Sequence, residues 1–188
     1  MHLVTAHGSV PSVSPLAEMA VDTWEVELGV RRTARRYCDA INGCPFASAD
    51  DMEQVLGAIK MAQEPTLVHV AFLTATDLGF KVSCSIQQLY AYARSLGLRL
   101  SPAELAPALA LSWDRLEGLP PLPIVVASNP IRVDNNHELT MSRLLGVHMV
   151  GRTRTLYAMA YPGSEMFPRQ IRWAFCVPSE LVPVRVHP

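Results

Sequence analysis

The sequence predicts an α+β fold in which N-terminal helices and a helix pair pack on a mainly antiparallel C-terminal sheet. Two observations support this prediction. Helical patterns fall before a proline-rich segment at residues 119–123, and mostly apolar segments of β type separated by glycines follow it. The chain also has no internal repeat and no regular alternation of strands with helices, which would indicate a parallel sheet.

The first third predicts an arm, one strand and two helices. Residues 1–16 are rich in Ser, Pro, Gly and Val without periodicity, so we expect a flexible arm before a single α+β domain at 17–188. Residues 24–28 alternate apolar and acidic side chains, which is typical of a short strand. A helix is expected at 33–41, and Ser48 is expected to cap a second helix at about 49–61 with acids in its first turn.

The middle of the chain predicts a strand at 67–73 and two capped helices. Ser85 and Gln88 have the spacing of a capping box, and Gly97 stands where a left-handed residue would end that helix. Its apolar stripe should pack on the sheet through Ile86, Leu89, Tyr90 and Ala93. The next helix is expected to begin with Ser101 as N-cap, Pro102 at N1 and Glu104 at N3, and to be short because of Pro107.

The C-terminal part predicts the sheet. Residues 124–127 read as a strand buried on both faces, and further strands are expected at 139–145, 147–150, 155–161 and 171–177. The last two look like antiparallel neighbours. The closing strand is apolar on successive positions, so it needs cover on both faces, and an open edge would invite pairing with a second copy. We therefore expect a homo-oligomer or a larger assembly.

Part of the chain resembles a loosely defined group of small uncharacterised bacterial proteins. The shared pattern is a Leu-Gly-Phe turn, a helix with Tyr and Ala, a Leu-Gly-Leu turn, a Pro-x-Glu helix start and a closing aromatic strand. Its residues here are Leu78-Gly79-Phe80, Tyr90, Ala93, Leu96-Gly97-Leu98, Pro102, Glu104, Pro130-Ile131, Trp173 and Phe175. The resemblance covers residues 66–177 and implies a fold but no activity. Ser101 stands where the group has a cysteine, so no role of that thiol carries over.

Composition narrows the class of function. A net charge of −1 and a pI near 6.6 argue against a general nucleic-acid binder. Only 18% of residues are charged and 49% are hydrophobic, so an apolar patch for a partner is one expectation and a large core is the other. The four cysteines are too scattered for a disulfide framework or a zinc module. No signal peptide or membrane-spanning run is recognisable, so we expect a cytoplasmic protein. We expect no cofactor, because the sequence has no phosphate-binding glycine loop and no dinucleotide fingerprint.

One polar cluster lies at residues 129–138 between two predicted strands. Asp134, His137 and Glu138 could bind a metal or move protons, and Asn136 completes the loop. Asp-Asn-Asn is also ordinary turn sequence, so a solvated turn is the competing interpretation. His148 is a further candidate ligand, if Cys176 or an acid lies near it.

The arginines form a second candidate. Arg31, Arg32, Arg35 and Arg36 are a dense basic group, and Arg152 with Arg154 is a smaller pair on a β-turn. Both could contact phosphate or an acidic protein, or they could be solvated surface. A helix-turn-helix interpretation is disfavoured, because residues 102–109 offer no side chain that reads base edges.

These patterns favour a non-enzymatic binding or protein-interaction module of unknown partner. The alternative is a small metal-dependent or hydrolytic enzyme that uses the loop from Asp134 to His137. The third is a nucleic-acid-associated accessory protein that uses the first arginine group. We expect a protein partner or a homo-oligomer, and neither nucleic acid nor a membrane.

Overall fold

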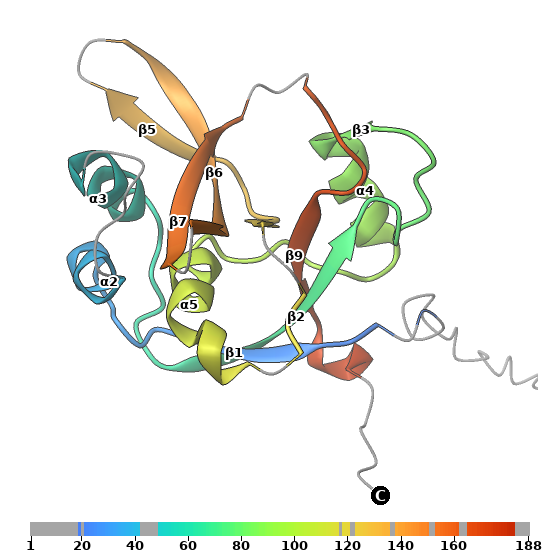
Figure 1. The fold of residues 1–188 in the computed structure, drawn as a ribbon, viewed down its shortest axis with the longest axis horizontal. Helices are drawn as coiled ribbons and strands as arrows, with labels where there is room; N and C mark the ends of the chain where they lie inside the picture. The colour runs from blue at the N-terminus through green and yellow to red at the C-terminus, as the bar shows by residue number, and fades with distance from the viewer. Residues whose placement is uncertain are drawn as a thin grey trace, which may run out of the picture.

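The computed structural model describes residues 19, 21–41, 49–116, 118–120, 123–135, 138–150, 153–161 and 165–182. They form an α+β fold, as predicted (Figure 1). The main sheet has the order β1-β2-β9-β4-β6-β5, with β7 on the other edge of β6. Its strands are β1 (Trp24–Leu28), β2 (Thr66–Thr74), β4 (Ile124–Val126), β5 (Ile131–Asn135), β6 (Glu138–Val150), β7 (Thr153–Ala160) and β9 (Arg172–Val177). A second, two-stranded sheet pairs β3 (Cys84–Ser85) with β8 (Met166–Phe167).

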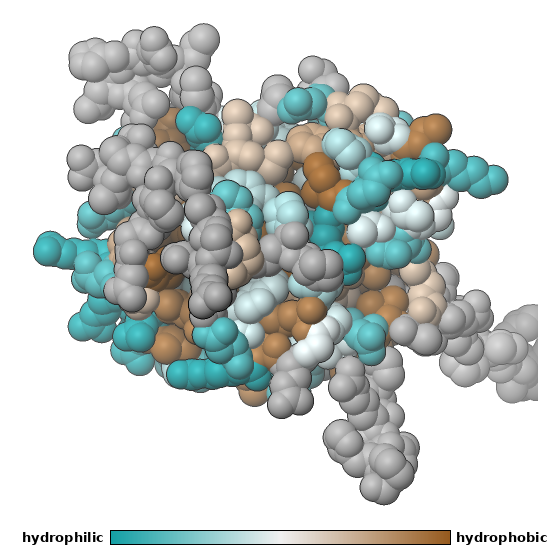
Figure 2. All heavy atoms as spheres, viewed as in Figure 1, coloured by the Kyte–Doolittle hydropathy of each residue, from teal (hydrophilic) through white to brown (hydrophobic). Residues whose placement is uncertain are grey.

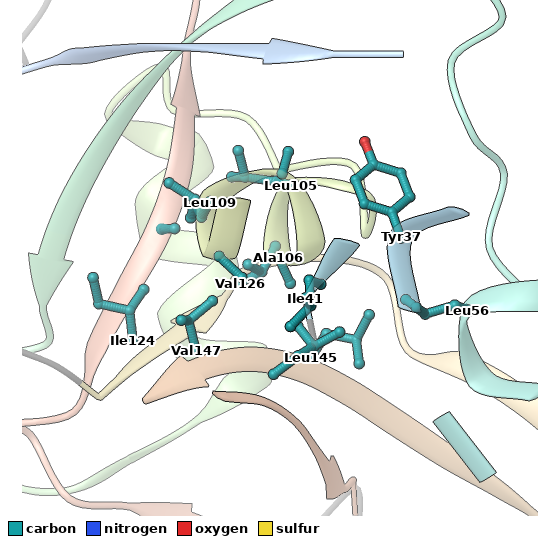
Figure 3. Packing of buried hydrophobic residues seen from close by; sticks show 14 of the residues in the cluster. Tyr37, Ile41, Leu56, Leu105, Ala106, Leu109, Ile124, Val126, Leu145 and Val147 are labelled. Atoms are coloured by element: carbon teal, nitrogen blue, oxygen red, sulfur yellow. The ribbon is translucent and has the colours of Figure 1, made fainter. Parts of the chain in front are cut away.

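One face of the sheet surrounds α5 (Leu105–Ser112), which packs against β1, β4, β6 and β7. Its residues from Leu105 to Ala110 are all buried, because Ala, Leu and Pro leave no polar face to turn outward. Two helices, α2 (Ala34–Ala40) and α3 (Ala49–Gly57), complete this core. In Figure 3, Tyr37 and Leu56 lie to one side of α5, and Ile124 and Val147 of the sheet lie to the other.

The opposite face of the sheet carries α4 (Ile86–Ser95), and here the predicted helix is confirmed. Ser85 and Gln88 form the capping box, with hydrogen bonds of 2.9 and 3.2 Å. At the other end Gly97 has φ 94°, and the Leu98 N–H donates to the Ala93 carbonyl at 3.0 Å. The predicted stripe is buried in a core with aromatic side chains of β9; its residues are Ile86, Leu89, Tyr90 and Ala93.

The predicted start of α5 is wrong. Ser101 does not cap the helix: its hydroxyl donates to the Ala174 carbonyl at 3.0 Å and so fastens the segment to β9. The helix begins at Leu105, and the Glu104 carboxylate makes no capping hydrogen bond. Pro107 lies in the first turn, where a missing N–H costs no helical hydrogen bond. The helix is short, as predicted.

The strand pairing also differs from the prediction. Gly146 does not end a strand, because β6 runs through it without a break. A Cβ at this position would lie 2.5 Å from the Ile124 carbonyl oxygen and 2.5 Å from the Tyr157 ring, so glycine serves close packing here. The strand β7 pairs with β6 and not with β9, while β9 lies inside the sheet between β2 and β4. The polar cluster at 129–138 is not a loop throughout, since residues 131–135 form β5.

The remaining short elements are two 3₁₀ turns, η1 (Trp113–Arg115) after α5 and η2 (Ser179–Leu181) after β9. Helix α3 ends at Gly57, earlier than predicted, and its expected cap, Ser48, is outside the described residues. The expected arm at 1–16 also lies outside them. Among the described helices, none combines the length and apolar character needed to cross a membrane.

Candidate functional site

A buried carboxylate organises the region where β1, α2 and α5 meet. Glu104 is only 1% exposed and accepts three hydrogen bonds. Its Oε1 accepts from the Gly29 N–H and from the Tyr37 hydroxyl, both at 2.8 Å, and its Oε2 accepts from the Ala62 N–H at 2.6 Å. Because a buried charge is tolerated only when it is well hydrogen-bonded, these contacts hold the three chain segments to the start of α5.

The turn between β1 and α2 is held in an unusual backbone conformation. Gly29 has φ 78°, and a Cβ there would overlap the Glu64 carbonyl. Arg32 has φ 57°, and the Thr33 N–H donates to the Arg31 carbonyl at 2.7 Å across it. Such a conformation costs an arginine about 1–3 kcal/mol and persists where surrounding contacts fix it. The Thr33 side chain then caps α2 by accepting from the Arg36 N–H at 3.3 Å.

The arginine surface consists of Arg31 and Arg32 on this turn and of Arg35 and Arg36 in the first residues of α2. All four side chains are exposed, and hydrophilic side chains gather over α2 at the left of Figure 2. None of the four forms an ion pair with another residue in the described ranges. The four arginines thus lie next to one another on the β1–α2 turn and at the start of α2, exposed within the described part of the chain.

A cavity of about 160 Å³, which we call the Tyr37 cavity, adjoins the arginine surface. It lies between the β1–α2 turn and the end of α5 and is lined by Glu27, Val30, Arg31, Tyr37, Ala108, Leu111, Ser112 and Arg115. A shallower hollow of about 390 Å³, the Asp39 hollow, is lined by Val30, Arg31, Arg36, Asp39 and Ala40. Val30 and Arg31 line both, so the two hollows are adjacent.

The Tyr37 hydroxyl stays protonated in this setting. Burial raises the pKa of Tyr37, the hydrogen bond to Glu104 raises it further, and the nearby Arg31 charge partly opposes both effects. A neutral phenol is therefore the donor to Glu104, and together they form a fixed structural pair beneath the cavity.

The other predicted site residues are only partly described. The backbone of Asp134 is in β5, but its side chain is not described, and Asn136, His137 and Arg152 lie outside the described residues. The backbone of Arg154 lies in β7 opposite Met149, also without a described side chain. No group of His, Cys, Asp and Glu suited to a metal occurs among the residues that were placed. The metal hypothesis at Asp134 and His137 therefore stays a prediction.

His148 and Cys176 lie on separate strands. The His148 ring contacts the Tyr157 ring on β7, with centroids 5.0 Å apart. Cys176 is on β9, and β4 lies between that strand and β6. Burial raises the pKa of the Cys176 thiol, which keeps it protonated and unreactive. These two residues do not support the site that the sequence suggested.

Sequence reasoning missed Glu104, Tyr37 and Arg115 as parts of a site. One feature of the sequence could have identified Glu104: it is the only charged residue in the apolar run from Pro102 to Leu111. A lone carboxylate in such a run is either a cap or a buried acid with its own donors. Arg115 and Tyr37 gave no local signal, since only the tertiary fold brings them to the β1–α2 turn. Comparisons of the chain with protein-family models, curated proteins and solved structures gave no match.

Proposed function

We propose that this chain is a non-enzymatic protein-interaction module whose arginine surface binds an acidic partner. The observation that carries the proposal is the exposure of four arginines on the β1–α2 turn and the start of α2, and both the turn and α2 hydrogen-bond to Glu104. Arginine suits this role because its planar group donates two parallel hydrogen bonds to a carboxylate. A fixed turn loses less conformational entropy on binding than a flexible turn does, so its rigidity favours the complex.

The charges around the surface favour a protein over nucleic acid. Glu27 lines the Tyr37 cavity and Asp39 lines the Asp39 hollow, so carboxylates are interspersed with the arginines. A polyphosphate backbone would be repelled at these points, whereas a protein segment can place neutral or basic groups there. The net charge of −1 also provides no long-range attraction for DNA or RNA.

Binding is favoured over catalysis because the acid and the phenol at this surface already have structural partners. The Glu104 carboxylate accepts hydrogen bonds from Gly29, Tyr37 and Ala62. Its proton-accepting oxygens therefore face the protein rather than a substrate. A general base needs an oxygen within hydrogen-bond reach of the substrate.

A direct test is fluorescence anisotropy with a labelled short peptide of Asp, Glu, Ser and Gly. We expect binding at low salt that weakens as salt screens the charges, and a loss of about tenfold or more when Arg35→Glu and Arg36→Glu are combined. The matched control combines Lys81→Glu with Arg94→Glu, both exposed and near α4. It makes the same change in net charge and should keep the binding.

A labelled single-stranded DNA of similar length is the competing probe. We expect no binding to it at physiological salt. Salt-sensitive DNA binding that exceeds peptide binding and is abolished by the Arg35→Glu, Arg36→Glu variant would overturn the proposal in favour of a nucleic-acid-associated protein.

A further inference from the structure

We infer that the Tyr37 cavity is the anchor pocket of this interface and takes one apolar side chain from an acidic segment of the partner. The inference rests on the proposed function and adds the kind of sequence that the surface recognises. It is drawn from the size of the cavity, the chemistry of its walls and its continuity with the arginine surface.

The size of the cavity favours one side chain over a free small molecule. Its volume is about 160 Å³. Sites for drug-sized ligands usually have about 300–1,000 Å³. A cavity of about 150 Å³ accommodates one benzene ring. A single Leu or Phe side chain is therefore the occupant that fits.

The walls combine apolar side chains with charged ones. Val30, Ala108 and Leu111 supply apolar surface, while Arg31 and Arg115 come from different segments of the chain. Neither arginine forms an ion pair with a residue that the structure describes. An apolar group that enters between them can bring a carboxylate of the neighbouring residue in its own chain to the Arg31 guanidinium. This is the arrangement of an energetically dominant contact, where an apolar anchor is surrounded by polar pairs.

The two adjacent hollows give the partner segment a direction. Val30 is 51% exposed and lies with Arg31 between the Tyr37 cavity and the Asp39 hollow. Arg36 lines that hollow, so a second carboxylate can bind there. Glu27 lines the Tyr37 cavity and is absent from the walls of the hollow, so it repels an acid at the cavity end. The recognised segment thus has an apolar residue in the Tyr37 cavity and acidic residues on one side of it. The acidic part of the segment runs past Arg31 toward Arg36.

The test is an anisotropy series in which one Phe is moved through each position of the acidic peptide. The reference is the same peptide with Ala at that position. We expect at least one register in which the Phe peptide binds about tenfold or more tightly, as the burial of one aromatic side chain allows. Val30→Ala, at an exposed position, should reduce this preference without affecting the fold.

A cavity-filling variant tests the location. Ser112 is half-buried at the end of α5, and its hydroxyl donates to the Ala108 carbonyl of its own helix, at 2.8 Å. Ser112→Phe should remove the preference for the Phe peptide and keep the binding of the Ala peptide. Ser112→Ala removes the hydroxyl without filling the cavity, and Ser95→Phe adds the same ring to the end of α4. Both controls should keep the preference, and circular dichroism verifies that each variant is folded.

The outcomes separate this inference from the proposed function. Equal affinity for Phe and Ala peptides in every register, with the arginine dependence retained, would overturn the anchor pocket alone. A preference for Phe that survives both Val30→Ala and Ser112→Phe would also overturn it. No binding of any acidic peptide at low salt would overturn both proposals.

Discussion

Glu104 shows how one side chain can determine the geometry of a surface that it does not reach. Its carboxylate lies beneath the β1–α2 turn and holds Gly29, Tyr37 and Ala62 by hydrogen bonds. The arginines above are exposed and have no described ion pair, so their positions depend on the backbone that Glu104 fixes. Removal of this carboxylate should therefore affect stability and binding together.

Glu104→Ala should lower the free energy of unfolding by about 3–5 kcal/mol, because it leaves buried donors without an acceptor. Urea titration measures the change. Glu180→Gln is the matched control: Glu180 pairs with Arg99 at 3.5 Å on the surface, where both side chains are about 70% exposed. That change should cost less than about 1 kcal/mol. Equal effects of the two substitutions would show that Glu104 does not organise the turn.

A second prediction at this scale concerns alkaline pH. Burial raises the pKa of Tyr157 to about 12, from 10.0 for the free side chain. The folded protein therefore keeps a proton that the unfolded chain loses above pH 10, so this contribution to stability is complete below pH 10 and is lost as the pH rises toward 12. Tyr157→Phe should remove this difference of one bound proton between the folded and the unfolded state. The fall of the free energy of unfolding with pH in that window should then become less steep by about 1.4 kcal/mol per pH unit. Chemical denaturation at several pH values measures the slope, and an unchanged slope would contradict the assignment.

Among the elements, the β1–α2 turn is the one with visible backbone strain. Arg32 has φ 57°, a left-handed conformation that glycine adopts readily and that is unfavourable for residues with a Cβ. Arg32→Gly should therefore raise stability by about 0.5–1 kcal/mol or leave it unchanged. The same substitution at Arg35, inside α2, should lower it by about 1 kcal/mol. Each variant loses one positive charge, so thermal unfolding of the two compares the backbone effect alone. A larger loss of stability in Arg32→Gly than in Arg35→Gly would show that the strain is absent.

The prediction for α4 rests on its buried stripe. Leu89 is 1% exposed beneath the helix, so Leu89→Ala should cost about 2–5 kcal/mol. Gln87→Ala on the exposed side of α4 is the control and should change stability by less than about 0.5 kcal/mol. A denaturant titration in which Leu89→Ala costs under about 1 kcal/mol would exclude this face from the core.

The comparison of α4 with β9 explains which elements could be predicted from the sequence. The limits of α4 were correct because Ser85, Gln88 and Gly97 act on backbone groups within four residues of themselves. The neighbours of β9 were wrong because strand pairing joins residues far apart in sequence, and an apolar strand fits many partners. Gly146 was misread for a related reason: the Tyr157 ring that requires a glycine there comes from another strand.

On the scale of the whole molecule, the candidate site joins parts that are distant in sequence. The arginine surface comes from the β1–α2 turn and the start of α2, and it was recognisable as four charges in six residues. The Tyr37 cavity also needs the end of α5 and Arg115, which only the enclosure of α5 by the sheet brings to this place. The sequence therefore predicted the charges of the site and could not predict its cavity.

The assembly state is the last prediction at this scale. The homo-oligomer or larger assembly was predicted because the closing strand needs cover on both faces and at its edge, but β9 lies between β2 and β4, and both of its faces are covered within the chain. The premise was wrong, and the oligomer stays a prediction without that support. A described edge still open to pairing is β1, whose exposed positions carry Glu25 and Glu27.

Two copies that paired along β1 would bring these acids together, and like charges across neighbouring strands oppose pairing. Self-association through β1 should therefore strengthen as salt screens the repulsion. Light scattering over a salt series at micromolar concentration measures this, with Glu25→Gln combined with Glu27→Gln as the variant that should dimerise at lower salt. A monomer mass at every salt concentration in both proteins would contradict the predicted homo-oligomer and leave the arginine surface to a different partner.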